Sequence, residues 1–232
     1  MRNTLIMDAG LVDFIEKLPL SKQIVTHIEL LRKGVYMLHF LRTADFLPGQ
    51  VVAISTDLSV PPRLYSICSG EQDEKLSVLF NLKSDGLLTP KLAQLSQGDP
   101  VWISTPFGAF LGDDQPAWWI AAGTGIAPFR SMMRSGMANG KTVIHGGRSA
   151  DSFYFQNEFL SAFGENYIRC CSGEHAEGLY HGRLTQWMQE QDRLSKDQTY
   201  YLCGSAEMVV EVRDILIEKE IPIDKIMSEI YF

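Results

Sequence analysis

A stretch in the second half of the chain, residues 118–130, combines residue types that bind phosphate groups. An apolar run leads into Gly123 and Gly125, and Pro128 follows where a helix can begin, because proline is tolerated in a first helical turn. Glycine lets the backbone approach a ligand closely, and the N–H groups and dipole of a helix N-terminus attract anions. The stretch therefore predicts a strand–loop–helix nucleotide site, although its glycines do not complete the G-x-G-x-x-G fingerprint of standard dinucleotide sites.

A second candidate, Arg63-Leu64-Tyr65-Ser66, places a charged fork, a flat aromatic ring and a hydroxyl within one short segment. Such a set suits a planar cofactor that carries phosphate. Strand alternation puts Arg63 and Tyr65 on one face and Leu64 and Ser66 on the other. Taken alone, the same residues are also explained by a surface arginine, a half-buried tyrosine and an exposed serine.

Three further positions could carry chemistry. Residues 86–90 are expected to open a helix with Thr89 as its N-cap, which makes a second candidate anion site or an ordinary capped helix. Cys203 ends an apolar run, so its thiol either faces a ligand or is a small buried side chain. Taken alone, Glu229 near the C-terminus is explained as a solvated charge.

The first half is built from short runs of Val, Ile, Leu and aromatic residues, separated by Pro and Gly turn signals. They predict strands over residues 23–31, 34–41, 50–55, 63–69, 75–82 and 100–104, and one helix over 89–95. Short strands at regular spacing indicate a barrel or a sandwich.

The second half alternates strands and helices after the turn-forming residues 112–116. Strands are predicted over residues 117–122, 142–145, 167–171, 199–203 and 225–230, and helices over 127–137, 152–163, 184–191 and 206–218. The alternation predicts a parallel sheet covered on both faces, and ligands of such sheets bind beyond the carboxyl ends of the strands.

The composition excludes several classes of protein. A net charge of −7 argues against nucleic-acid binding, which depends on Lys and Arg. The four cysteines form no C-x-x-C pattern, so no iron–sulfur cluster, zinc site or other bound metal is expected. No apolar run is long enough to span a membrane and no signal-peptide core begins the sequence, so we expect a cytoplasmic protein.

Together these motifs resemble those of the ferredoxin–NADP reductase family over nearly the whole chain. The matching segments are, in order, residues 63–66, 85–92, 98–101, 106–108, 123–130 and 202–205. The first two are similar to the family's two flavin motifs, the next two to segments between its domains, and the last two to its nicotinamide-nucleotide loop and C-G motif. Thr105 stands where the family usually has glycine. No single motif is decisive, but their order and spacing are specific.

The resemblance implies an FAD-binding antiparallel Greek-key β-barrel over residues 1–112, with residues 1–20 as a lead-in. It implies an α/β parallel-sheet domain for a nicotinamide nucleotide over residues 113–232. The implied FAD-binding residues are Arg63, Leu64, Tyr65, Ser66, Leu88, Thr89, Thr124, Tyr231 and Phe232. The implied NAD(P)-binding residues are Gly123, Gly125, Ile126, Ala127, Pro128, Gly147, Arg148, Ser172, Arg183, Cys203 and Gly204.

The resemblance also implies catalytic roles for Ser66, Cys203, Glu229 and Tyr231. Ser66 would hydrogen-bond flavin N5, and Cys203 and Glu229 would line the nicotinamide pocket. Tyr231 would cover the flavin until nicotinamide displaces it, and whether Tyr231 or Phe232 stacks there stays open.

The choice between NADPH and NADH depends on contacts to the 2′-phosphate, which arginine usually supplies. Arg148 and Arg183 match arginines of the bacterial members. The family's Ser-Arg pair appears here as Ser172-Gly173, so one expected cation is missing. We expect NADPH, with NADH as the alternative.

The implied function is FAD-dependent electron exchange between NAD(P)H and ferredoxin or flavodoxin. An NAD(P)H:flavin reductase and an electron-transfer subunit of a larger redox complex are the alternatives. We expect a monomer or a weak dimer. Residues 1–112 hold ten Lys and Arg against eleven Asp and Glu, and this near neutrality permits an acidic ferredoxin to dock.

Overall fold

The computed structural model describes residues 4–5, 14–15 and 17–231, and only the backbone of Thr4, Leu5 and Tyr231. Contacts between residues divide the chain into two units. The barrel unit takes its described residues from 6–112 and 127–135, and the sheet unit takes the rest. One change of unit falls at residue 113, residues 127–135 belong to the barrel unit, and the strand β1 (Thr4–Leu5) belongs to the sheet unit. The domain bounds expected from the sequence, 1–112 and 113–232, stay predictions.

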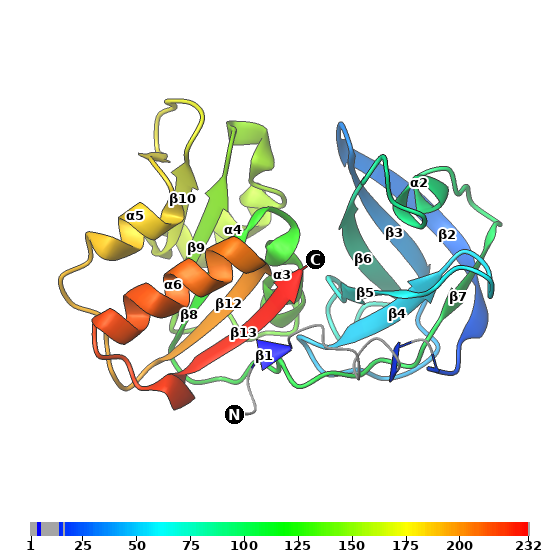
Figure 1. The fold of residues 1–232 in the computed structure, drawn as a ribbon, viewed down its shortest axis with the longest axis horizontal. Coiled ribbons are helices and arrows are strands. Elements are labelled where there is room, and N and C mark those ends of the chain that lie inside the picture. Colours follow the sequence, from blue (N-terminus) through cyan, green and yellow to red (C-terminus); the bar gives the residue numbers. More distant parts are fainter. Residues whose placement is uncertain (1–3, 6–13, 16, 232) are drawn as a thin grey trace. The chain divides into compact units, whose positions relative to one another are not determined.

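The barrel unit is an antiparallel sheet that closes on itself (Figure 1). Its elements are β2 (Ser21–Arg32), β3 (Val35–Leu41), β4 (Val51–Ser55), β5 (Arg63–Ser66), β6 (Lys75–Asn81), α2 (Thr89–Leu92) and β7 (Pro100–Ile103). The strands pair in the order β5-β4-β7-β2-β3-β6, and a bridge between Ile67 and Val78 joins the two edges. Strand β7 pairs with both β2 and β4, although it is distant from them in sequence. The long connection that returns the chain to these strands is typical of a Greek key.

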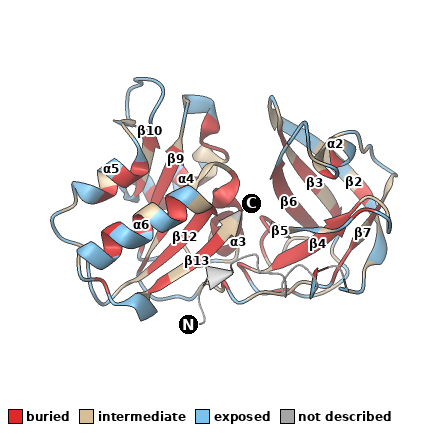
Figure 2. Cartoon of the chain, viewed as in Figure 1, coloured by how far each residue is buried: buried red, intermediate tan, exposed pale blue. Residues whose placement is uncertain are grey.

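Alternate side chains fill the barrel. Leu38 on β3 lies opposite Val78 on β6, and both are fully buried. Tyr36 stacks on Phe80 with 5.4 Å between ring centroids. Figure 2 shows the resulting buried positions along these strands. Removing this apolar surface from water is what stabilises the barrel.

The helix expected over residues 89–95 is a single turn, α2, and the expectation that Thr89 caps it is wrong. Thr89 is the first helical residue, and its hydroxyl accepts the Lys83 N–H at 2.9 Å and reaches the Lys83 carbonyl at 3.2 Å. Beyond Leu92 the chain turns at Ser96, whose N–H donates to the Asp99 carboxylate at 2.7 Å. A helix this short offers no aligned dipole for an anion.

The sheet unit is a parallel sheet with strand order β1-β13-β12-β8-β9-β10-β11. Its strands after β1 are β8 (Ala117–Ala122), β9 (Lys141–Gly147), β10 (Tyr167–Cys171), β11 (Tyr180–His181), β12 (Thr199–Ser205) and β13 (Ile226–Tyr231). Its helices are η1 (Gly123–Ile126), η2 (Ala150–Ser152), α4 (Gln156–Phe163), η3 (Gly164–Asn166), α5 (Leu184–Gln189), α6 (Ala206–Glu218) and η4 (Ile223–Lys225). None of the described helices is long and apolar enough to cross a membrane.

Strand alternation sends apolar side chains to both faces of this sheet. On one face Ile120 and Ile144 share a buried cluster with Leu184 of α5 and Val212 of α6. On the other face Trp119 meets Phe163 of α4 edge-on, with 5.8 Å between ring centroids. The helix predicted over 152–163 begins late, at Gln156, because Phe155 has a left-handed φ of 60° that interrupts it.

Helix α3 (Ala127–Arg134) follows η1 in the chain but contacts the barrel unit. Arg134 holds the Asp73 carboxylate through two hydrogen bonds of 3.0 Å. Nη1 of Arg130, which is nearly buried, donates to the Cys68 carbonyl at 3.0 Å. These bonds attach α3 to the segment between β5 and β6.

Lys141 at the start of β9 is buried in the sheet unit, with a relative exposure of 2%. Its ammonium donates to the carbonyls of Asp113 at 2.9 Å and Gln115 at 2.6 Å, and it lies 5.6 Å from the centre of the Trp119 ring. A buried charge needs such partners, because its desolvation is costly. The bonds hold the segment that enters β8 against the sheet.

We predict that Lys141→Met lowers the free energy of unfolding by about 1–3 kcal/mol, since it removes two charge-assisted hydrogen bonds. Urea denaturation would measure this. Lys219 is a matched control, because its ammonium also donates to two carbonyls, of Gln189 and Gln191, but it is half-exposed. An equal loss in Lys219→Met would contradict the importance of burial at Lys141.

Candidate functional site

The glycine loop η1 follows β8 and lies against the end of β12. A Cβ atom at position 125 would overlap the carbonyl oxygen of Cys203 and would lie 2.9 Å from the Cα of Gly204. Only glycine therefore fits at position 125 without movement of the backbone. Thr124 and Ile126 are buried in the same loop. The sequence-predicted loop residues and the Cys203-Gly204 segment are thus brought together.

Cys203 and Glu229 lie on adjacent strands, in register, near the carboxyl end of the sheet. The Cys203 side chain is fully buried and that of Glu229 has an exposure of 8%. The thiol donates to Oε2 of Glu229 across 3.9 Å. Glu229 is therefore not a solvated charge, and the thiol and the carboxylate that the sequence proposed for one site are neighbours.

The loops after β9 and β10 place the residues expected at the 2′-phosphate. The Ser172 N–H donates to the carbonyl of Gly147 at 3.1 Å, which joins the two loops. A Cβ atom at Gly173 would overlap the carbonyl oxygen of Arg148, so this backbone has no room for the arginine that the family pattern expects there. The Glu174 carboxylate accepts the N–H of Ala150.

Arg183 precedes α5 and is exposed. It pairs with Glu207 of α6 at 3.5 Å, where the two side chains have relative exposures of 67% and 79%. An ion pair this exposed contributes little, so an anionic ligand can displace it.

On the barrel, β5 carries the second predicted motif. Arg63 is exposed, and its guanidinium makes no hydrogen bond or ion pair with the residues that the structure describes. Tyr65 meets Phe80 edge-on at 6.2 Å, and burial raises the pKa of its hydroxyl. Ser66 is almost fully buried, so the alternative that it is an exposed serine is wrong. Leu64, between Arg63 and Tyr65 in the strand, is half-buried.

The remaining predicted site residues pack in the barrel core, belong to helix α3 or have side chains outside the described residues. Leu88 is buried in the barrel core, so its side chain serves packing. Ala127 and Pro128 begin α3 and belong to the barrel unit by their contacts. Tyr231 ends β13, paired with Ser205, but its side chain lies outside the described residues, and so does Phe232.

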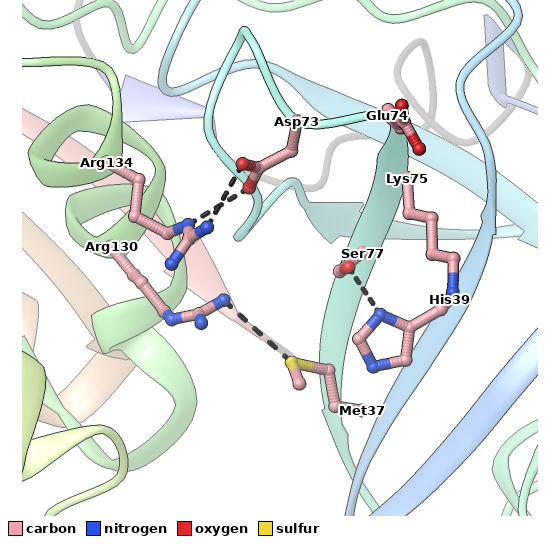
Figure 3. Close-up of a pocket in the computed structure, with 8 residues that line it drawn as sticks. All are labelled: Met37, His39, Asp73, Glu74, Lys75, Ser77, Arg130 and Arg134. Atoms are coloured by element: carbon pink, nitrogen blue, oxygen red, sulfur yellow. Dashed lines mark hydrogen bonds and ion pairs between the residues drawn. The ribbon is translucent and has the colours of Figure 1, made fainter.

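A cavity of about 330 Å³ lies in the barrel unit, between the outer face of β3 and β6 and helix α3 (Figure 3). It is lined by Met37, His39, Asp73, Glu74, Lys75, Ser77, Arg130 and Arg134. None of the predicted cofactor residues lines it. Burial, with the nearby charges of His27, Lys75 and Arg130, lowers the pKa of His39 to about 4. Among the described residues no group of three or more His, Cys, Asp or Glu is arranged to hold a metal ion.

His145 on β9 is a residue of this region to which sequence reasoning assigned no role. Its side chain is fully buried, Nε2 lies 3.1 Å from the carbonyl oxygen of Gly123, and Nδ1 lies 3.0 Å from the Tyr167 hydroxyl. One feature of the sequence could have pointed to it: His145 ends the apolar run before Gly146, at a position where an aliphatic side chain is the usual choice.

Comparisons with known proteins agree with this arrangement. Residues 119–214 match the family model of the oxidoreductase NAD-binding domain. The chain is 30% identical to the toluate 1,2-dioxygenase electron transfer component of Pseudomonas putida, over 74% of this chain and 54% of the relative. It is 27% identical to the ferredoxin–NADP reductase of Azotobacter vinelandii, over 74% of this chain and 78% of that protein.

Residues 119–214 therefore match the NAD-binding domain of oxidoreductases, and the relatives and solved structures support the ferredoxin–NADP reductase family for this chain.

The fold itself has a solved counterpart. A ferredoxin–NADP reductase from Neisseria gonorrhoeae, solved with bound FAD and NADP, matches it with a TM-score of 0.83 and 19% identity. The match covers 92% of this chain and 99% of that structure. The predicted fold class, an antiparallel barrel followed by a parallel α/β domain, is confirmed.

The buried His145 predicts a dependence of stability on pH. Burial lowers its pKa from the ordinary 6.5 to about 4, and its titratable neighbours, Tyr154 and Tyr167, are uncharged in this range. Between these values the unfolded chain binds a proton that the folded protein does not. The free energy of unfolding should therefore fall as the pH drops from 7 towards 4, by an amount on the order of 2–3 kcal/mol.

Denaturant titrations at pH 7, 6 and 5 test this, with His145→Gln as the variant that cannot titrate. The variant should lose less stability over this range than the wild type. His39→Gln is the matched comparison for the second histidine, whose pKa is also lowered to about 4, and it should likewise reduce the loss of stability on acidification. Identical slopes in wild type and His145→Gln would contradict the prediction.

Proposed function

We propose that this protein is an FAD-dependent oxidoreductase that exchanges electrons between NAD(P)H and a one-electron carrier, ferredoxin or flavodoxin. The observation that carries the proposal is the glycine loop packed against the backbone of Cys203, whose thiol donates to Glu229, in a chain whose relatives include ferredoxin–NADP reductases. The Azotobacter relative is named for this activity. The bound flavin would supply the chemistry, because it accepts a hydride and releases electrons singly.

The residues on β5 fit a flavin nucleotide. Arg63 presents a guanidinium, which has no recorded partner among the described residues, as a bidentate donor for pyrophosphate. Tyr65 would pack against the ring system, while Ser66 would donate a hydrogen bond from a position that excludes water. The backbone around Leu88 and Thr89 completes the proposed FAD set on the barrel, and the FAD-binding roles implied for Thr124, Tyr231 and Phe232 stay predictions.

The residues at the carboxyl end of the sheet fit the nicotinamide nucleotide. The η1 backbone, from Gly123 to Ile126, would bind the pyrophosphate, with Ala127 and Pro128 continuing into helix α3. Cys203 and Glu229 would orient the nicotinamide ring, since their hydrogen bond holds both in a buried position. Gly147, Ser172 and Gly204 would line the base of this proposed nicotinamide-nucleotide site.

A second function is favoured by a specific observation. The chain is 30% identical to the toluate 1,2-dioxygenase electron transfer component, of which it spans 54%. An electron-transfer subunit of a larger redox complex is therefore the main alternative, and an NAD(P)H:flavin reductase is another. The carrier, a monomeric or weakly dimeric state and a cytoplasmic location stay predictions.

The proposal is tested by purifying the protein and recording its visible spectrum and FAD content. We predict a retained flavin that NADPH or NADH bleaches anaerobically, followed by turnover with ferredoxin or flavodoxin in place of free flavin. A colourless protein that reduces only added flavin would contradict the proposal and identify a flavin reductase. Turnover only in the presence of a co-purifying oxygenase subunit would favour the larger complex.

Coenzyme choice is tested at Arg183. We expect NADPH to be the coenzyme, so Arg183→Ala should weaken NADPH binding by about 10- to 100-fold, because a charge-assisted contact of about 1.5–3 kcal/mol is lost. NADH binding should change less than about threefold. Arg213→Ala is the matched control, since Arg213 is also exposed and paired to a carboxylate, that of Asp214, at 3.4 Å. Equal losses of NADPH and NADH would show that Arg183 does not bind the 2′-phosphate.

A further inference from the structure

His145 lies directly beneath the glycine loop. On the paired strands β8 and β9, His145 is in register with Ala121, two residues before Gly123. Its ring is enclosed by aromatic side chains, with centroid distances of 5.4 Å to Phe153 and 6.3 Å to Tyr167. The imidazole therefore has no contact with water and must satisfy both of its nitrogens within the protein.

The two hydrogen bonds of His145 determine its tautomer. The Gly123 carbonyl oxygen can only accept, so the proton of the ring is on Nε2, which donates to it across 3.1 Å. Burial keeps the ring neutral, since its pKa is about 4. Nδ1 is then a bare acceptor, and the Tyr167 hydroxyl donates to it across 3.0 Å. Tyr167 thus selects the form of His145 that can bind the loop.

The bond to Gly123 orients one peptide group of the loop. In a planar trans peptide the C=O and the following N–H point in opposite directions. Because the Gly123 carbonyl points down to His145, the Thr124 N–H points away from it, to the outer side of the loop. A rotation of this peptide would turn a carbonyl oxygen, which repels an anion, to that side.

We propose that His145, held by Tyr167, is a positioning residue that orients the Gly123–Thr124 peptide for the pyrophosphate of the nicotinamide nucleotide. This rests on the proposed function of the loop. The pyrophosphate is common to NADPH and NADH, so the effect of His145 must be the same for both coenzymes. This separates it from Arg183, whose effect is expected for NADPH alone. His145 acts on binding through the backbone, so the rate of flavin reduction at saturating coenzyme should change little.

The test compares His145→Asn with His145→Gln in the FAD-bound protein. The Gln amide nitrogen can reach the place of Nε2 and donate to Gly123, whereas the Asn amide ends near Nδ1 and cannot. Dissociation constants for NADP⁺ and NAD⁺ are measured by flavin difference spectra, and maximal flavin reduction by stopped flow. We expect His145→Asn to weaken both coenzymes by about tenfold, the loss of one buried hydrogen bond, and His145→Gln by less than about threefold.

Tyr167→Phe removes only the hydroxyl, and it provides a second measurement if His145→Asn does not fold. It should weaken both coenzymes by about threefold, with unchanged FAD content. Wild-type affinity in both His145→Asn and Tyr167→Phe would overturn the proposal, and so would equal losses in the Asn and Gln variants that follow their thermal stability. Failure of the wild type to bind either coenzyme would instead contradict the proposed function of the loop.

Discussion

The carbonyl oxygen of Cys203 occupies the space that a side chain at position 125 would need. This close approach of two backbones seats the loop after β8 on the end of β12. The same strand holds Cys203 beside Glu229, so the loop, the thiol and the carboxylate share one rigid support. A site built on adjacent parallel strands keeps its geometry because each strand is held by its neighbours on both sides.

Buried polar groups connect the loops of the sheet unit to its strands. Lys141 holds the carbonyls of Asp113 and Gln115, and His145 holds that of Gly123. A buried donor without a partner is costly, so each of these side chains favours one loop conformation over the others. These polar contacts help to fix where the chain enters β8 and how it leaves it.

The candidate residues on the barrel differ in burial. Arg63 is exposed on β5 while Ser66, three residues later, is buried, so one strand offers a charge to solvent and a hydroxyl to a dry position. Helix α3 belongs to this unit because Arg130 and Arg134 bind the segment after β5. Similarity to ferredoxin–NADP reductases and this distribution of residues are the basis for proposing a flavin nucleotide on the barrel and a nicotinamide nucleotide on the sheet.

Local patterns in the sequence were sufficient for most strands and for a glycine turn after the run over residues 117–122, whereas the pairing of Cys203 with Glu229 was suggested only by the resemblance to a known family. They depend on periodicity and on a few turn residues, which act over short distances along the chain. Thr89 was wrongly expected to cap α2, and α4 was expected to begin before Phe155. Only the tertiary structure decided that α3 contacts the barrel, that β1 pairs with β13, and that His145 binds Gly123. These contacts join residues far apart in sequence, so they cannot be predicted from hydrophobic periodicity, which reflects only neighbours along the chain.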